Sequence, residues 1–191
     1  MIKSALQSSL TNDIKYRSMS AGAVPSSEYL ITSTILTQAT PTITFDFTGL
    51  SGTYKHLQIV AAVKSTRTGG SAEMYGRANG LTQYWNHWLV GGGSSVGSGN
   101  FSYSKMFFGN AASSDTASDF AAFTIDLLDP FGTTKNKTVR TLSGLYSTQT
   151  QIRLASSIIP TTSPLTSFSF EIEPATNFTI GTRFSLYGVT A

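Results

Sequence analysis

The sequence predicts an all-β fold, an antiparallel β-sandwich of roughly ten strands. Apolar and polar residues alternate with a period of two from residue 29 to residue 189. Clusters of Gly, Pro, Asn, Asp and Ser interrupt that alternation at spacings of about 8 to 15 residues. The chain also holds 27 Thr among its 191 residues, and a branched Cβ favours the pleated sheet. A jelly-roll-like arrangement of two packed sheets fits this strand count.

The chain divides into an N-terminal segment, 1–27, and a sandwich domain, 28–191. Apolar residues recur every four positions in the N-terminal segment with basic residues beside them, which predicts one short helix and a linker. Such a helix is marginal alone in water, so it would need a surface to dock on. The alternatives are a frayed terminus and an arm, helical or extended, that anchors the domain to a partner. The predicted anchoring residues are Ile2, Leu6, Leu10, Ile14, Tyr16 and Arg17.

The first three strands are expected at 29–36, 42–47 and 54–64. Leu30 is out of step with the alternation of the first of them. The third strand is apolar on both faces, which predicts a central place in its sheet. Its expected inward residues are Leu57, Ile59, Ala61 and Val63.

The middle of the chain predicts strands at 73–80, 84–90 and 101–108. Residues 91–100 contain only Gly, Ser, Val and Asn, which predicts a flexible loop between strands. This loop leads into a strand rather than a helix and lacks Gly-Lys-Ser/Thr, so a phosphate-binding loop is not expected.

The last five strands are expected at 120–129, 136–147, 151–159, 165–173 and 183–189. The clearest alternation lies in the fourth of these strands, where aromatic and aliphatic residues occupy every second position. Its expected inward residues are Phe168, Phe170 and Ile172.

Composition excludes several classes of function. Only 12% of the residues are charged, the net charge is +3, and the basic residues are scattered, so no nucleic-acid partner is expected. The absence of cysteine excludes disulfides, thiolate catalysis and cysteine-based zinc sites. No apolar run reaches the roughly 20 residues that cross a bilayer, and no signal peptide is expected.

The sequence predicts no enzyme, no cofactor and no metal site. His56 and His87 are the only histidines, and neither a Gly-x-Ser-x-Gly motif nor a His-x-x-x-His pair occurs. Calcium binding at Asp115 and Asp119 is an alternative, although calcium loops concentrate more carboxylates. Glu171 and Glu173 share a strand face opposite the aromatic one, so they are expected at the surface rather than in a glycosidase site.

An aromatic and amide cluster at residues 84–88 is a candidate for glycan binding, because aromatic faces stack on sugar rings. Strand alternation places Tyr84, Asn86 and Trp88 on one side of the strand. Trp85 then lies on the other side, so at least one tryptophan is expected in the core or in a subunit interface.

Short elements of the chain resemble small virion proteins of tailed bacteriophages, especially marine and cyanobacterial ones. Residues 53–59 read Thr-Tyr-Lys-His-Leu-Gln-Ile, and 77–80 read Arg-Ala-Asn-Gly. A Tyr-x-x-His-x-Leu element matches Tyr84, His87 and Leu89, where the leucine is displaced by one residue from Trp88. A Gly/Ser loop follows, and residues 184–189 read Phe-Ser-Leu-Tyr-Gly-Val. The usual Asn-Gly-Asp is Asn-Gly-Leu here, which weakens any idea of an acidic site in that turn.

This resemblance, which covers residues 28–191, implies a non-enzymatic structural protein located in the virion. Its expected partners are other virion proteins, as a capsid decoration or head-fibre protein or as a tail-fibre or adaptor protein. Closed cyclic symmetry, with a homotrimer as the expected form, is typical of such assemblies. The alternative is a carbohydrate-binding module that recognises polysaccharide of the host surface.

Overall fold

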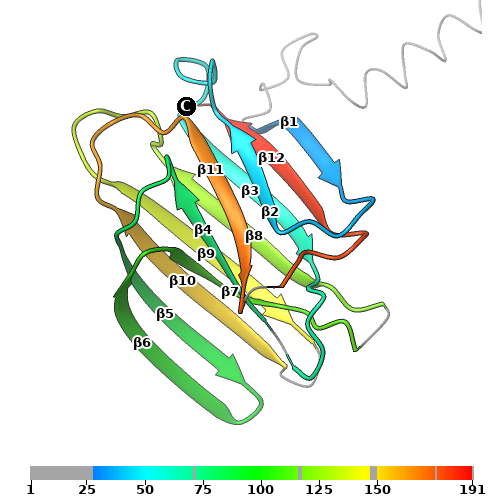
Figure 1. Cartoon of the computed structure of the whole chain (residues 1–191). Helices are drawn as coiled ribbons and strands as arrows, with labels where there is room; N and C mark the ends of the chain where they lie inside the picture. Colours follow the sequence, from blue (N-terminus) through cyan, green and yellow to red (C-terminus); the bar gives the residue numbers. More distant parts are fainter. Residues whose placement is uncertain (1–27, 71, 116–117, 147–149, 175, 191) are drawn as a thin grey trace, which may run out of the picture.

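The protein is a sandwich of two antiparallel β-sheets (Figure 1). The computed structural model describes residues 28–70, 72–115, 118–146, 150–174 and 176–190. These residues form twelve strands and no helix. The predicted all-β, jelly-roll-like sandwich is therefore confirmed, with more strands than the roughly ten that turn spacing suggested. The predicted anchoring arm, 1–27, lies outside the described residues.

The large sheet has eight strands in the order β1-β12-β3-β8-β9-β10-β5-β6, and the small sheet has four in the order β2-β11-β4-β7. The strands are β1 (Glu28–Ile35), β2 (Thr42–Asp46), β3 (His56–Val63), β4 (Ala72–Ala78), β5 (Tyr84–Gly92), β6 (Ser95–Tyr103), β7 (Met106–Ala111), β8 (Ala121–Leu128), β9 (Lys137–Leu145), β10 (Gln151–Ile159), β11 (Ser167–Glu173) and β12 (Arg183–Val189).

The core lies between the two sheets, where the predicted alternation places its apolar residues. Strand β3 sits inside the large sheet between β12 and β8, as its apolar composition predicted. Aromatic rings then join the sheets: Phe170 of β11 lies 4.9 Å, centroid to centroid, from Phe184 of β12. The predicted inward residues Leu57, Ile59, Ala61, Val63, Phe168, Phe170 and Ile172 are all buried.

Leu30 is exposed because it lies on the outer face of the large sheet, opposite Tyr187 of β12. The next residue, Ile31, packs against the core. The pairing register of β1 with β12 shifts only after Leu30, before Thr32, and such an irregularity changes the face on which the following side chains lie.

The predicted loop at 91–100 is wrong. Strands β5 and β6 form a hairpin in which Gly92 pairs with Ser95 and Tyr84 pairs with Tyr103. The turn needs only two residues, and Gly93 adopts a positive φ of 57° there. Glycine and serine carry little strand propensity, so backbone pairing along a sheet edge outweighs local preference here.

The single strand predicted at 101–108 is also wrong, because it is two strands in different sheets. Strand β6 ends at Tyr103, the chain bends at Ser104 and Lys105, and β7 begins at Met106 in the small sheet. Near this crossing, inward side chains of β6 contact the small sheet: Phe101 lies 6.0 Å from Phe107, between ring centroids. The far end of the large sheet thus closes against the edge of the small one.

A candidate functional site on the outer face of the small sheet

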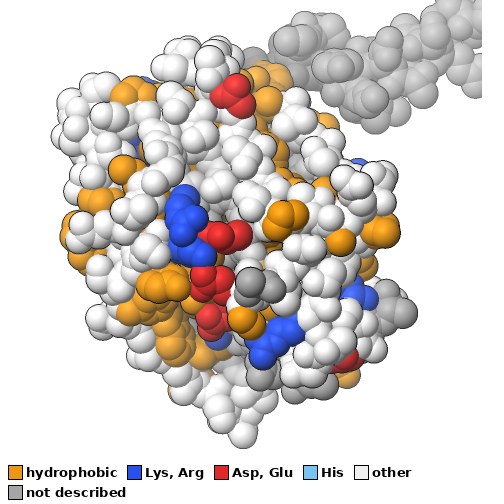
Figure 2. Space-filling view, viewed as in Figure 1, with side chains coloured by type: hydrophobic (Ala, Val, Ile, Leu, Met, Phe, Trp, Pro, Cys, Tyr) orange, Lys and Arg blue, Asp and Glu red, His pale blue; other side chains and the backbone are white. Residues whose placement is uncertain are grey.

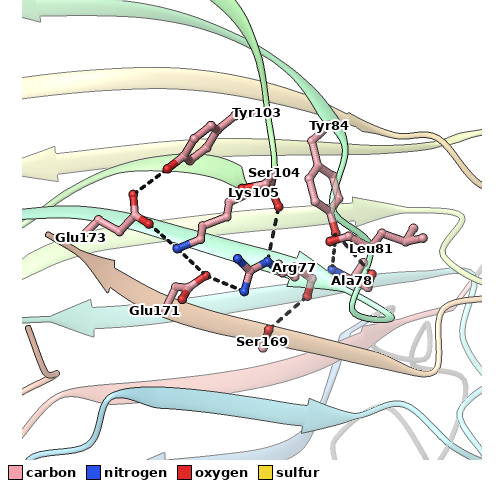
Figure 3. A network of polar contacts seen from close by, with 10 residues as sticks. All are labelled: Arg77, Ala78, Leu81, Tyr84, Tyr103, Ser104, Lys105, Ser169, Glu171 and Glu173. Carbon is pink, nitrogen blue, oxygen red and sulfur yellow. Dashed lines mark hydrogen bonds and ion pairs between the residues drawn. The ribbon is translucent and has the colours of Figure 1, made fainter. Parts of the chain in front are cut away.

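The densest group of charges in the described chain lies on the outer face of the small sheet (Figure 2). Strand alternation turns Met74 and Phe170 into the core and leaves their neighbours on the opposite face. Ser104 and Lys105, at the bend between β6 and β7, reach the same place. We call this group the polar cluster: Arg77, Tyr103, Lys105, Glu171 and Glu173 (Figure 3).

Lys105 is the centre of the polar cluster. Its Nζ lies 3.1 Å from Glu171 Oε1 and also bonds Glu173 Oε1. Arg77 Nη1 lies 3.1 Å from the same Glu171 oxygen, while Arg77 Nε donates to the Ser104 carbonyl at 3.3 Å. The Tyr103 hydroxyl donates to Glu173 Oε2 at 3.2 Å. Each carboxylate is therefore held by at least two donors from elements distant in sequence.

These contacts shift the ionisation of the cluster. Burial acts to lower the pKa of Lys105, but its hydrogen bonds to Glu173 and Glu171 outweigh burial and raise that pKa above its ordinary value. The negative charge of Glu173 raises the pKa of the Tyr103 hydroxyl. Nearby, burial and then the hydrogen bond to Glu73, 2.6 Å long, raise the pKa of Tyr75. Lysine and tyrosine thus both hold their protons at neutral pH.

Arg153 of β10 closes the side of this region that faces the large sheet. Its guanidinium lies 5.1 Å from the Trp88 ring centroid and 4.7 Å from that of Phe107. It donates to Gln151 Oε1 at 2.9 Å, and burial lowers its pKa. A planar cation between two rings is a favourable cation–π arrangement. It links β5 and β10 of the large sheet to β7 of the small sheet.

The predicted glycan-binding residues lie where the β5–β6 hairpin meets the small sheet, but most of their polar groups are used internally. Tyr84 is 0% exposed, and its hydroxyl accepts from Ala78 N at 3.0 Å and donates to Leu81 O at 3.0 Å. Asn86 is buried against β7. Trp88 is half-buried, and its ring packs over Gly99, where an added Cβ would lie 2.8 Å from the ring.

The other candidate residues hold loops together. His56 Nδ1 accepts a hydrogen bond from Asp129 N at 2.9 Å. Asp115 Oδ2 accepts from Gly69 N at 2.7 Å, which lowers the pKa of Asp115 and joins two loops. Among the residues that the structure describes, no three His, Asp or Glu side chains are placed to hold a metal ion. The predicted anchoring residues Ile2, Leu6, Leu10, Ile14, Tyr16 and Arg17 lie outside the described residues.

Sequence reasoning missed the polar cluster. Alternation did place Glu171 and Glu173 on one face, but it could not supply their partners. Lys105 is 68 residues away from Glu173 along the chain. The available signal was the combination of a lysine at a bend with two carboxylates at every second position of a strand.

A second surface lies on the outer face of the large sheet, around β9, β10 and β5. Large apolar side chains are exposed there; for example, Ile152 is 65% exposed and Leu142 is 53% exposed. We call this surface the apolar face: Val60, Leu89, Val96, Leu128, Leu142, Ile152, Leu154, Ile158 and Trp85. Trp85 lies on this side of β5, opposite to Tyr84 and Trp88 as strand alternation predicted, and it is 45% exposed rather than in the core.

Comparisons with known proteins identify no relative of this chain. No family model matches the chain, and no match was found among curated proteins or among solved structures. In the part of the chain that the structure describes, no helix is long and apolar enough to cross a membrane.

Proposed function

We propose that the chain is a non-enzymatic structural component of a tailed-phage virion, either a capsid decoration or head-fibre protein or a tail-fibre or adaptor protein. In this role the N-terminal arm docks the protein, and the sandwich is displayed as a homo-oligomer, with a trimer as the expected form. The observation that carries the proposal is the apolar face. Large apolar side chains that gather on one exposed sheet face usually contact other proteins.

The polar cluster supports the same role. Glu171 and Glu173 are both bound to Lys105, and each has a further donor. Cross-linked charges on a strand face stiffen a scaffold, which suits a protein whose task is to hold a shape.

Immunogold electron microscopy tests the proposal directly. An antibody raised against the purified full-length chain should label intact particles of the phage whose genome encodes it, at one defined place on the head or tail. Particles complemented with a chain that lacks residues 1–27 should carry no label, while the truncated protein stays folded by circular dichroism. Unlabelled wild-type particles would refute the virion role, and labelled truncated particles would refute the anchoring arm alone.

Carbohydrate binding is the second candidate function, and one observation favours it. Tyr103 is 39% exposed, and its ring lies beside the carboxylate of Glu173. An exposed ring next to charged acceptors is how proteins commonly hold sugar hydroxyls. Binding of the wild type to a glycan array, lost in Tyr103→Ala and in Trp88→Ala, would support this function. If the wild type binds no glycan at millimolar concentration, carbohydrate binding is excluded.

A further inference from the structure

We propose that the apolar face is the surface on which a second copy of this chain packs, sheet against sheet. This inference rests on the proposed function. Because the same face is used by both copies, the contact is two-fold and gives a dimer rather than the trimer expected above. Its support comes from the register of the strands, the charges beside the face, its area and its relief.

Strand register makes the face continuous. Directly opposed residues point to the same side of a sheet. Leu154 of β10 is opposite Leu142 of β9 and opposite Leu89 of β5, so three leucines form one row. In the adjacent row, Ile152 lies between Gly144 and Gly91, and Gly91 is opposite Val96 of β6. Both rows run across the same four strands.

The polar row beside these leucines is neutralised within the chain. Arg140 of β9 is opposite Asp126 of β8, and its Nη2 and Nε lie 2.8 and 3.1 Å from Asp126 Oδ2. Gln58 Nε2 donates to Asp126 Oδ1 at 2.9 Å. A partner therefore meets no uncompensated charge in this row, and an identical copy brings no net charge of its own there. Beyond this row Ile158 and Trp85, which are opposite each other, continue the apolar surface.

The exposed apolar area approaches that of a standard interface. Summed over its side chains on both sides of the polar row, the apolar face presents on the order of 700 Å², against about 800 Å² per partner. Packed sheets stack face to face about 10 Å apart, as the two sheets within one chain already do.

The apolar face is not flat, because it carries one protruding side chain and a groove beside it. Val96, at the tip of the β5–β6 hairpin, is 92% exposed. Next to it lies a shallow groove of ≈ 600 Å³ lined by Leu89, Gly91, Ile152 and Leu154, among others. A side chain built on Gly91 or Gly144 would meet nothing within 4 Å. A protruding aliphatic side chain and an open glycine furrow on one face allow two copies to interdigitate.

Sedimentation velocity and light scattering on the full-length chain test the inference. The wild type should form a concentration-dependent oligomer. Leu154→Arg and Gly144→Arg should raise the dissociation constant of self-association by about 30-fold or more, because each places a charge in the contact. Gly144→Arg does not disturb the fold, since its Cβ enters open space. Ile180→Arg, at an exposed apolar position in the turn before β12 and outside both sheets, is the matched control and should keep the wild-type mass.

A cysteine probe locates the contact. The chain contains no cysteine, so Leu154→Cys carries a polarity-sensitive fluorophore at one position only. Its emission should shift to the blue as protein concentration rises, while a probe at Ile180→Cys, outside both sheets, should not respond. Circular dichroism and thermal unfolding verify that each variant is folded.

Several outcomes would overturn the inference. A wild type that stays monomeric at all concentrations removes the second copy as partner. Oligomers that persist in both face variants place the contact elsewhere. A monomer whose apolar face binds a hydrophobic dye only after deletion of residues 1–27 shows that the chain's own N-terminal segment covers the face. None of these results affects immunogold labelling of the virion, so failure of this inference is distinguishable from failure of the proposed function.

Discussion

The side chain of Asn86 on β5 completes the edge of β7, because its Oδ1 accepts a hydrogen bond from the Phe107 backbone N–H at 2.9 Å. Its Nδ2 donates to the Lys105 carbonyl at 3.1 Å, so one amide replaces both partners of a missing strand. Ser157 Oγ donates to Asn86 Oδ1 at 2.7 Å. Strand β7 is the edge of the small sheet, and an unpaired edge invites pairing with another chain. Asn86 of the large sheet thus occupies hydrogen-bonding groups at the edge of β7 that another chain could otherwise pair with.

Replacement of Asn86 by leucine should destabilise the domain by about 3 kcal/mol, because the buried N–H of Phe107, the carbonyl of Lys105 and the hydroxyl of Ser157 lose their partner. Urea unfolding followed by tryptophan fluorescence measures the change. Asn100→Leu, at an exposed position of β6, is the control and should change the unfolding free energy by less than about 0.5 kcal/mol. Equal stabilities of the two variants would show that Asn86 does not hold the sheets together.

Lys105→Met should lower the unfolding free energy by about 2 kcal/mol, because Glu173 loses its ion pair beside a second carboxylate and Glu171 keeps only Arg77. The Glu171 and Glu173 side chains are 25% and 28% exposed, so solvent screens part of the repulsion. Adding Glu173→Gln to Lys105→Met should restore part of the loss. A double-mutant cycle measures the coupling, and additivity within about 0.5 kcal/mol would contradict the ion-pair account.

Tyr75 should make the protein sensitive to alkali. Burial first, and then the hydrogen bond to Glu73, raise the pKa of Tyr75 above 10.0 in the folded state. Below pH 10 both states keep the phenol proton; above it the unfolded chain loses that proton first, so the stability contribution is lost as pH rises. Unfolding free energies at a series of pH values should fall less steeply above pH 10 in Tyr75→Phe than in the wild type. Equal slopes would refute the assignment.

Substitution by alanine should destabilise the protein at one glycine of the sheets and leave its stability unchanged at another. A Cβ on Gly76 of β4 would overlap the backbone carbonyl of Ser169 and lie 2.7 Å from the Phe108 ring, so Gly76→Ala should cost about 3 kcal/mol. A Cβ on Gly144 meets nothing within 4 Å, so Gly144→Ala should stay within about 0.5 kcal/mol of the wild type. Thermal unfolding of both variants provides the comparison. If Gly76→Ala unfolds at the wild-type temperature, β4 and β11 separate more easily than their close packing suggests.

The alternation of apolar and polar residues predicted the strands in which it is regular. In β3 and β11 every second residue is apolar, and burial of one face requires that period. The pairing of Glu171 with Glu173 on one face followed from the same rule. The β5–β6 hairpin carried a misleading signal, because Gly and Ser between 91 and 100 are typical of loops. Only the neighbouring strand supplies the hydrogen bonds that make them a strand.

By itself the sequence determined the fold class, the central place of β3 and the inward residues of β11, because strand alternation and turn residues act over short distances along the chain. The tertiary structure alone decided that residues 101–108 serve two sheets, that Lys105 meets Glu171 and Glu173, and that Leu142, Leu154 and Leu89 form one row. Each of these depends on which strands lie side by side. That order is set by the packing of the whole core, in which strand neighbours such as β3 and β12 are far apart in sequence.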